Sequence, residues 1–260
     1  MKREELSIRA GGATLEAQLI RDLDEARGPT LVFLHEGLGS TSAWRDFPAR
    51  VRERVGGSAF LYSRRGYGRS DPAVLPRRPD FMHEEAEILA EVLASAPLAG
   101  PKVLVGHSDG GTIALLYAAR ALAEDVRAIV AIAPHVFVED ITEARLTATR
   151  RAYAAGDLRV RLARHHADPD ATFHGWIDLW LSPDFRSWNI EAELEGVNVP
   201  LVLVQGRQDE NGTLAQLEAI AARVRGPVTT ILLDDCGHQA HRAQPEGVIA
   251  AIADAVRAFT

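Results

Sequence analysis

Short, continuously apolar segments alternate with longer amphipathic ones along most of this chain, and that alternation constrains its fold more than any other feature. The apolar segments have the length of strands and indicate strands buried on both faces. The amphipathic segments between them have helical length and periodicity. We therefore expect an α/β fold with a mostly parallel sheet and helices on both of its faces. The predicted strands are 30–34, 59–62, 103–105, 128–133, 201–204 and 229–233, and the predicted helices are 43–55, 81–95, 110–123, 213–224 and 245–258.

Two regions depart from this alternation. Residues 5–20 alternate apolar and polar positions around two glycines, which predicts a half-buried antiparallel hairpin at the N-terminus. Residues 137–195 contain no strand candidate and are rich in Arg, Ala and Leu, which predicts a helical insertion. Because such sheets bind ligands at the carboxyl edge of their strands, we expect the insertion to cover that edge. The predicted division is an α/β core of residues 1–135 and 196–260 and a helical cap of residues 136–195.

Composition and charge limit the kinds of partner that this chain is expected to bind. The 260-residue chain has a formal net charge of −7 and no basic stripe, so we expect no nucleic-acid partner. It has no apolar run of membrane-spanning length and no signal-peptide core, so we expect no membrane association and a cytoplasmic location. One cysteine excludes an intrachain disulfide, and the histidines lack carboxylate partners at ligand spacing, so we expect no metal. A homodimer is left open.

Residues 106–110 read Gly-His-Ser-Asp-Gly, at the junction of a predicted strand and a predicted helix. Gly106 and Gly110 have no Cβ, so the strand and the helix can approach closely. Ser108 then takes strained backbone angles with its hydroxyl projecting outward, as an attacking group. The alternative is a turn in which the serine only caps a helix.

A serine hydroxyl is a weak nucleophile at neutral pH, so Ser108 needs a base and an acid that orients the base. Asp209 and His238 follow the last two predicted strands, and a parallel sheet brings the carboxyl ends of its strands to one edge. The chain order Ser, Asp, His is that of the α/β-hydrolase triad. Glu210 adjoins Asp209 and is the alternative acid.

Four segments, in this order, resemble motifs of the α/β-hydrolase superfamily, in its small esterase and lactonase-like branch with a helical cap. The resemblance implies that Ser108 is the nucleophile, Asp209 the orienting carboxylate and His238 the general base and then general acid. It also implies that the backbone N–H of Gly37 joins that of Asp109, the residue after the nucleophile, in an oxyanion hole. The segments are 34–40 (LHEGLGS), 63–71 (SRRGYGRSD), 106–111 (GHSDGG), and 237–238 (GH) before 244–246 (QPE).

The chain departs from the family pattern at Glu36, which stands where glycine is usual. A carboxylate in the oxyanion hole would oppose the negative charge that develops there, so we expect the Glu36 side chain to turn away. Arg64 and Arg65 are its candidate partners. The alternative is that a raised pKa makes Glu36 a second proton donor.

The insertion offers candidates for substrate binding. Trp176 and Trp180 are spaced i, i+4, so they share one helix face, which either lines a pocket or packs in the core. With Phe137, His135 and Glu36 they make up the candidate substrate-binding residues.

The predicted function is a serine hydrolase that cleaves a small carboxylic ester, thioester or lactone through an acyl-enzyme, without a cofactor. We expect an apolar or aromatic small-molecule substrate. The alternatives are a carbon–carbon bond hydrolase or lyase that uses the same site, and a non-catalytic receptor for a small ligand.

Overall fold

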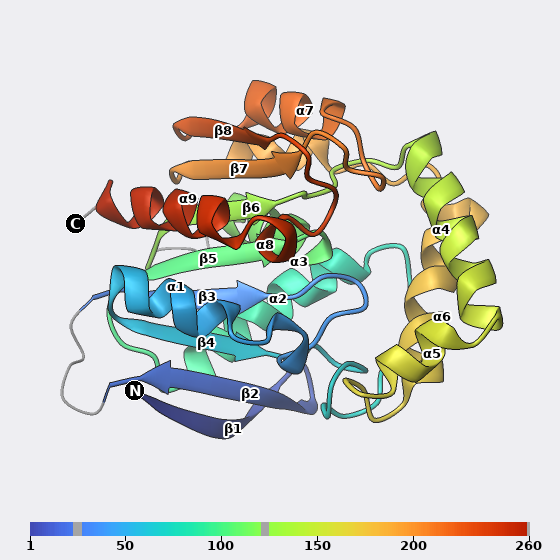
Figure 1. The fold of residues 1–260 in the computed structure, drawn as a ribbon, viewed down its shortest axis with the longest axis horizontal. Coiled ribbons are helices and arrows are strands. Elements are labelled where there is room, and N and C mark those ends of the chain that lie inside the picture. The colour runs from blue at the N-terminus through green and yellow to red at the C-terminus, as the bar shows by residue number, and fades with distance from the viewer. Residues whose placement is uncertain (23–27, 121–124, 259–260) are drawn as a thin grey trace.

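The computed structural model of the protein describes residues 1–22, 28–120 and 125–258. Within these residues eight strands form one sheet, in the order β1-β2-β4-β3-β5-β6-β7-β8 (Figure 1). β2 runs antiparallel to both of its neighbours, and the strands from β3 to β8 pair in parallel. The predicted mostly parallel sheet with an N-terminal antiparallel hairpin is therefore confirmed. The strands are β1 (Lys2–Ala10), β2 (Ala13–Arg21), β3 (Thr30–Leu34), β4 (Ser58–Tyr62), β5 (Lys102–His107), β6 (Val126–Ile132), β7 (Leu201–Gly206) and β8 (Val228–Leu233).

Helices cover both faces of the sheet, as the alternation predicts. α1 (Phe47–Val55) and α9 (Pro245–Arg257) pack together on one face and share an apolar cluster with the strands. α2 (Phe81–Ser95), α3 (Asp109–Ala119) and α7 (Ala215–Arg223) contribute to a second cluster on the other face.

One predicted helix is interrupted in the structure. Residues 43–55 divide into a 3-10 helix, η1 (Ser42–Trp44), and the helix α1. Arg45 lies between them with a φ of 56°, a left-handed conformation that a helix cannot contain, and a proline in the first turn of α1 restarts the helix. Of the predicted helix over 110–123, residues 121–123 lie outside the described part of the chain.

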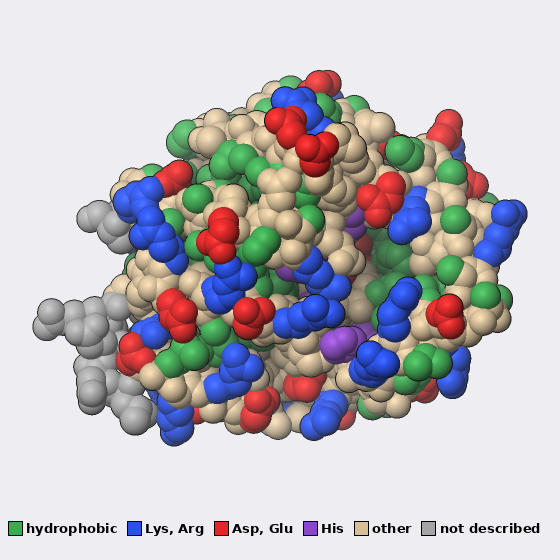
Figure 2. Space-filling model, in the orientation of Figure 1, with side chains coloured by type: hydrophobic (Ala, Val, Ile, Leu, Met, Phe, Trp, Pro, Cys, Tyr) green, Lys and Arg blue, Asp and Glu red, His purple; other side chains and the backbone are tan. Residues whose placement is uncertain are grey.

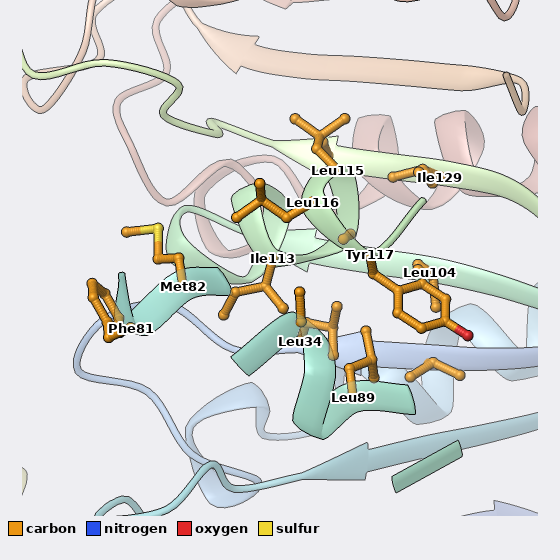
Figure 3. Close-up of a cluster of buried hydrophobic side chains, with 14 of the residues drawn as sticks. Leu34, Phe81, Met82, Leu89, Leu104, Ile113, Leu115, Leu116, Tyr117 and Ile129 are labelled. Atoms are coloured by element: carbon orange, nitrogen blue, oxygen red, sulfur yellow. The ribbon is translucent and has the colours of Figure 1, made fainter. Parts of the chain in front are cut away.

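The helix α3, which directly follows Ser108, is anchored by the larger cluster. Figure 3 shows Ile113 and Leu116 of α3 among side chains of α2 and of the central strands, including Leu89, Leu34 and Leu104. These residues are at most 3% exposed. Complete burial of a side chain of this size contributes about 1.5–3 kcal/mol, so the cluster fixes α3 firmly against the sheet.

Three helices form the region between β6 and β7. α4 (Asp140–Ala154), α5 (Asp157–Leu162) and α6 (Pro169–Trp180) stand together beside the carboxyl ends of the parallel strands (Figure 1). α6 begins where Asp168 accepts a hydrogen bond from the backbone N–H of Ala171, with a proline in the first turn. The region continues with η2 (Pro183–Phe185) and η3 (Glu191–Gly196).

The predicted helical character of this region is confirmed, whereas its separation from the core as a cap remains a prediction. No helix among the described residues combines the length and apolarity needed to cross a membrane.

The sheet has a switch point between β3 and β5. β3 lies between β4 and β5, so the chain leaves β3 toward one side and later returns to its other side. The loops that follow β3 and β5 therefore diverge and leave a crevice at the carboxyl ends of the strands, which is where such sheets bind ligands.

Candidate active site

Ser108 occupies the strained turn that the sequence predicts. It lies directly between β5 and α3, with a φ of 53° and a ψ of −120°. A Cβ on Gly106 would lie 2.3 Å from the carbonyl oxygen of Gly110, and a Cβ on Gly110 would lie 2.0 Å from that of Leu34. Both glycines are therefore required for close approach, and the serine between them is held at the carboxyl edge of the sheet.

His238 and Asp209 form a carboxylate–imidazole pair. Nδ1 of His238 lies 3.0 Å from Oδ1 and 2.9 Å from Oδ2 of Asp209. Because a carboxylate can only accept, Nδ1 carries the proton and Nε2 is left free to act as a base. The backbone N–H of Asn211 donates to Asp209 Oδ1 at 2.8 Å, and Nε2 of Gln205 donates to Oδ2 at 3.3 Å.

Electrostatics keep this carboxylate ionised. Burial works to raise the pKa of Asp209, but the hydrogen bond and charge of His238, with the Asn211 N–H, bring the pKa below its usual value. Glu210, the alternative acid, instead accepts the backbone N–H of His238 at 3.2 Å and faces Arg145 at 3.5 Å. Of the two acids it is Asp209 that meets the imidazole ring.

A cavity of about 710 Å³ joins the two halves of the site. Ser108 and His238 both line it, although no hydrogen bond between Ser108 Oγ and His238 is present among the described residues. Figure 2 shows the molecule hollowed beside the three helices, with Lys or Arg side chains around the opening. The helices contribute Thr142, Arg145, Leu146, Ala148, Thr149, Ala152, Leu158, Arg161, Trp176 and Trp180 to the wall.

The two predicted oxyanion donors belong to residues that line this cavity. Gly37 and Asp109 both line the cavity, and neither backbone N–H donates a hydrogen bond within the described part of the chain. The N–H of Asp109 is the first of α3, where the helix dipole is positive. This pair matches the predicted oxyanion hole in position.

Arg64 holds the two sides of this hole together. Its guanidinium is 2% exposed and donates to the carbonyl oxygen of His35 at 2.7 Å and to that of Glu36 at 3.3 Å. Its Nη2 also lies 3.7 Å from Oδ2 of Asp109. Burial raises the pKa of the Asp109 carboxyl, against the opposing charge of Arg64. The guanidinium thus ties the loop after β3 to the start of α3.

The side chain of Glu36 pairs with neither Arg64 nor Arg65, and its pKa is lowered rather than raised. Its carboxylate lies 3.6 Å from Nδ1 of His107 and 3.8 Å from Nη2 of Arg242, whereas Arg64 contacts only the backbone of Glu36. Arg65 donates to the carbonyl oxygen of Pro72 instead. Burial works to raise the pKa of Glu36, but the neighbouring His107, His241 and Arg242 lower it well below the usual value. A carboxylate held ionised in this way is not the second proton donor.

Four of the five candidate substrate-binding residues line the cavity: Glu36, His135, Trp176 and Trp180. Phe137 is not among the lining residues, because it forms a β-bridge with Asn189 and its ring packs against the larger core cluster.

His135 stands beside the base. Its ring centroid is 5.7 Å from that of His238 and 5.6 Å from that of Trp180. Burial, and then the neighbouring His238, lower the pKa of His135 to about 3, so its ring is uncharged at neutral pH.

Sequence reasoning missed the contribution of α4 and α5 to the cavity wall. Leu146 and Leu158 line it, but in an amphipathic helix a leucine that faces a cavity and one that faces a core give the same pattern. Arg161 also lines the cavity. No group of three or more His, Cys, Asp or Glu side chains in the described ranges could hold a metal ion.

We expect Gly37→Ala to lower kcat/KM by about 100-fold, because it displaces one oxyanion donor. Gly37 has no positive φ, but a Cβ there would lie 2.1 Å from Nε1 of Trp176. The loop or the indole must therefore move. Esterase kinetics of Gly37→Ala, alone and combined with Trp176→Ala, measure the effect, and the loss should be smaller in the background that lacks the indole. An equal loss in both backgrounds would contradict this explanation.

A comparison with protein families shows where the chain belongs. Residues 31–251 match the model of the alpha/beta hydrolase family. The chain belongs to this family. No curated protein matches it in a sequence comparison.

Solved structures of other alpha/beta hydrolases share its fold. A 2-hydroxy-6-oxo-6-phenylhexa-2,4-dienoate hydrolase from Rhodococcus sp. superposes with a TM-score of 0.79 at 14% identity, over 98% of this chain and 99% of that one. The enol-lactonase of Burkholderia xenovorans gives 0.73 at 18%, over 97% and 100%. The carboxylesterase CesB of Bacillus subtilis gives 0.68 at 21%, over 97% and 90%. At these identities the likeness shows the fold alone.

Proposed function

We propose that this alpha/beta hydrolase is a serine hydrolase that cleaves a small carboxylic ester, thioester or lactone. One observation carries the proposal: a strained serine and a carboxylate-oriented imidazole line one cavity. An imidazole whose Nδ1 is occupied by Asp209 presents Nε2 as a base, which is what a serine nucleophile requires.

The reaction runs in two half-reactions. Nε2 of His238 takes the hydroxyl proton of Ser108 as Oγ attacks the carbonyl carbon, and the carbonyl oxygen becomes an oxyanion. The N–H groups of Gly37 and Asp109 stabilise that oxyanion, each contributing about 3–4 kcal/mol. His238 then gives its proton to the leaving group, which leaves an acyl-enzyme on Ser108.

Water completes the cycle. His238 deprotonates a water molecule that attacks the acyl carbon, and Ser108 Oγ recovers the proton as the carboxylic acid departs. The gap between Ser108 and His238 in the free protein is compatible with this route, since catalytic hydrogen bonds commonly tighten only when substrate binds. The site itself needs no cofactor for these steps.

The cavity wall supports a substrate with an apolar acyl or alcohol part. Leu146, Leu158, Trp176 and Trp180 are apolar surfaces within it, and the uncharged His135 adds a ring beside the base. Arginines and Glu210 share the lining with them, so polar groups can be accommodated as well. We propose a small, partly apolar or aromatic ester or lactone.

A second serine–histidine contact in the chain offers a competing nucleophile. Ser42 Oγ lies 2.8 Å from Nδ1 of His165, a shorter contact than any that Ser108 makes through its hydroxyl. Ser42 and His165 do not line the cavity, and no carboxylate pairs with His165 in the part of the chain that the structure describes. An imidazole without an orienting acid is the weaker base.

Covalent labelling distinguishes the two serines. We expect a fluorophosphonate to modify wild-type protein with a stoichiometry of one and to add its mass to the peptide that contains Ser108. Ser42→Ala should label at the wild-type rate. An ester that gives a burst of alcohol equal to the enzyme concentration supports the acyl-enzyme. Label on Ser42, or no label, would overturn the proposal and favour carbon–carbon chemistry or a ligand receptor.

A further inference from the structure

The backbone of Glu36 is held independently of its side chain. Its carbonyl oxygen accepts hydrogen bonds from His35 Nδ1 at 2.7 Å, from the N–H of Gly39 at 3.0 Å and from Arg64 at 3.3 Å. The carboxylate is therefore not needed to shape the loop that carries Gly37. Placing a carboxylate in a largely buried position costs free energy. Because the loop does not need the carboxylate of Glu36, its position indicates another role.

The carboxylate of Glu36 occupies a space that the missing side chain of Gly39 leaves open. A Cβ on Gly39 would lie 2.4 Å from Glu36 Oε2, so the glycine leaves room for it. Its Oε2 faces His107 Nδ1 at 3.6 Å, and Oε1 faces Arg242 Nη2 at 3.8 Å. The side chain is 16% exposed, at the edge of the cavity.

His107 links this carboxylate to the base. Its Nε2 lies 2.9 Å from the backbone carbonyl oxygen of His238, and a carbonyl oxygen only accepts, so Nε2 carries a proton. Nδ1 is then the nitrogen that faces Glu36, at 3.6 Å from Oε2. The fully buried ring packs 4.9 Å from the ring of His238, centroid to centroid.

We infer that Glu36 and His107 form a second carboxylate–imidazole pair, which positions the general base through its own backbone carbonyl. His107 fixes the carbonyl of His238, and the carboxylate of Glu36 faces the other nitrogen of the same ring. The negative charge of Glu36 also favours the positive charge that His238 acquires when it takes the serine proton. Glu36 and His107 are thus positioning residues, and the inference rests on the proposed function.

Several other titratable or charged side chains surround His238, and the substitution Glu36→Gln leaves all of them in place. Asp209 and Glu210 approach from the loop after β7, and His135 from the loop after β6. His241 and Arg242 belong to the short helix α8 (Ala240–Ala243), where the ring of His241 lies 4.7 Å from that of His107. Their effects are common to the wild type and the variants, so a difference between these proteins reports on the pair.

The pair is tested first by the proton on the His107 ring, which needs no enzymatic activity. Long-range nitrogen–proton NMR of the imidazoles, with His107→Gln for assignment, is expected to show a proton on Nε2 of His107 in the wild type, donated to the carbonyl oxygen of His238. Glu36→Gln should shift the Nδ1 resonance of His107, which faces the carboxylate in the wild type. An Nε2 without a proton in the wild type, or His107 resonances that Glu36→Gln leaves in place, would overturn the inference.

Kinetics test the positioning role. Glu36→Gln is expected to lower kcat/KM by about tenfold and to move the acid limb of its pH profile about one unit lower, since one unit corresponds to a factor of ten. The shift is downward because the variant lacks the carboxylate that favours protonation of His238. A profile that superimposes on the wild type would overturn the inference.

A matched control removes the same kind of pair elsewhere. Glu193 lies 2.8 Å from Nε2 of His83, and neither residue lines the cavity. Glu193→Gln should leave both kcat/KM and its pH profile unchanged. Failure of Ser108 labelling in the wild type would count against the proposed function, whereas a normal label with an unshifted Glu36→Gln profile would count only against the pair.

Discussion

Ser108→Ala is expected to lower kcat for ester hydrolysis by about 10⁶-fold, the loss seen when a triad nucleophile is removed elsewhere. Alanine keeps the Cβ that already occupies the strained turn, so the backbone at φ 53° is unchanged. Among the residues that the structure describes, the hydroxyl of Ser108 makes no hydrogen bond that the fold would lose. The free energy of unfolding should therefore stay within about 0.5 kcal/mol of the wild type.

The measurement is kcat on p-nitrophenyl esters of graded chain length, with thermal unfolding followed by circular dichroism. Ser42→Ala is the matched control, because Ser42 also contacts a histidine but lies outside the cavity. It should keep the wild-type kcat. A Ser108→Ala variant with more than a few per cent of wild-type activity would remove Ser108 from the role of nucleophile.

The fold could be predicted because strands that are buried on both faces of a sheet have continuously apolar sequences. β3 and β5 are buried at every position, so residues 31–34 and 103–105 are continuously apolar and cannot be mistaken for one-sided strands. The hairpin differs because one of its faces meets solvent, which produces the alternation in β1. The break in the predicted helix at Arg45 was not predictable, since nothing in the residue itself requires a positive φ.

The candidate reacting groups could also be named from the sequence, because each adjoins a short pattern that predicts its place in the fold. Ser108 lies between two glycines whose missing Cβ atoms allow the turn, and Asp209 and His238 follow buried strands. Elements that share one edge of a parallel sheet bring such residues together whatever their separation in sequence. That is why three distant segments could be joined without coordinates.

The environment of Glu36 could not be predicted in this way. Its partners His107 and Arg242 come from the end of β5 and from a four-residue helix, and neither position carries a sequence pattern that points to Glu36. Arg64 had seemed the natural partner, but its guanidinium is occupied by two carbonyl oxygens and Asp109. Pairing between side chains of separate loops depends on side-chain directions that only tertiary structure fixes.

Asp209→Asn is expected to lower kcat by about 10⁴-fold while the structure of the site is kept. An amide can donate to Nδ1 of His238 where the carboxylate only accepts, so the imidazole is stabilised in the wrong tautomer and Nε2 is no longer a free base. The loss should fall on kcat with little change in KM, because Asp209 does not line the cavity. Steady-state kinetics with the best ester from the chain-length series measure it.

Glu210→Gln is the decisive comparison, since Glu210 is the adjacent acid and contacts His238 only through its backbone N–H. A glutamine oxygen can still accept that N–H, so we expect a loss of less than about tenfold, as for the removal of a single modest hydrogen bond. If kcat of Glu210→Gln fell as far as kcat of Asp209→Asn, Asp209 would not be the acid that orients His238.

The acid stability of the two proteins gives an independent check on Asp209. Its pKa is lowered in the folded state, despite burial, by the hydrogen bond and charge of His238. The stabilisation is therefore complete above the unfolded-state pKa of about 3.9 and is lost as the pH falls through the folded-state value. Asparagine does not titrate, so the difference in unfolding free energy between the wild type and Asp209→Asn should shrink below about pH 4. A difference that stayed constant from pH 7 to pH 3 would mean that the carboxylate is not held ionised by the imidazole, and the base would then lack its orienting charge.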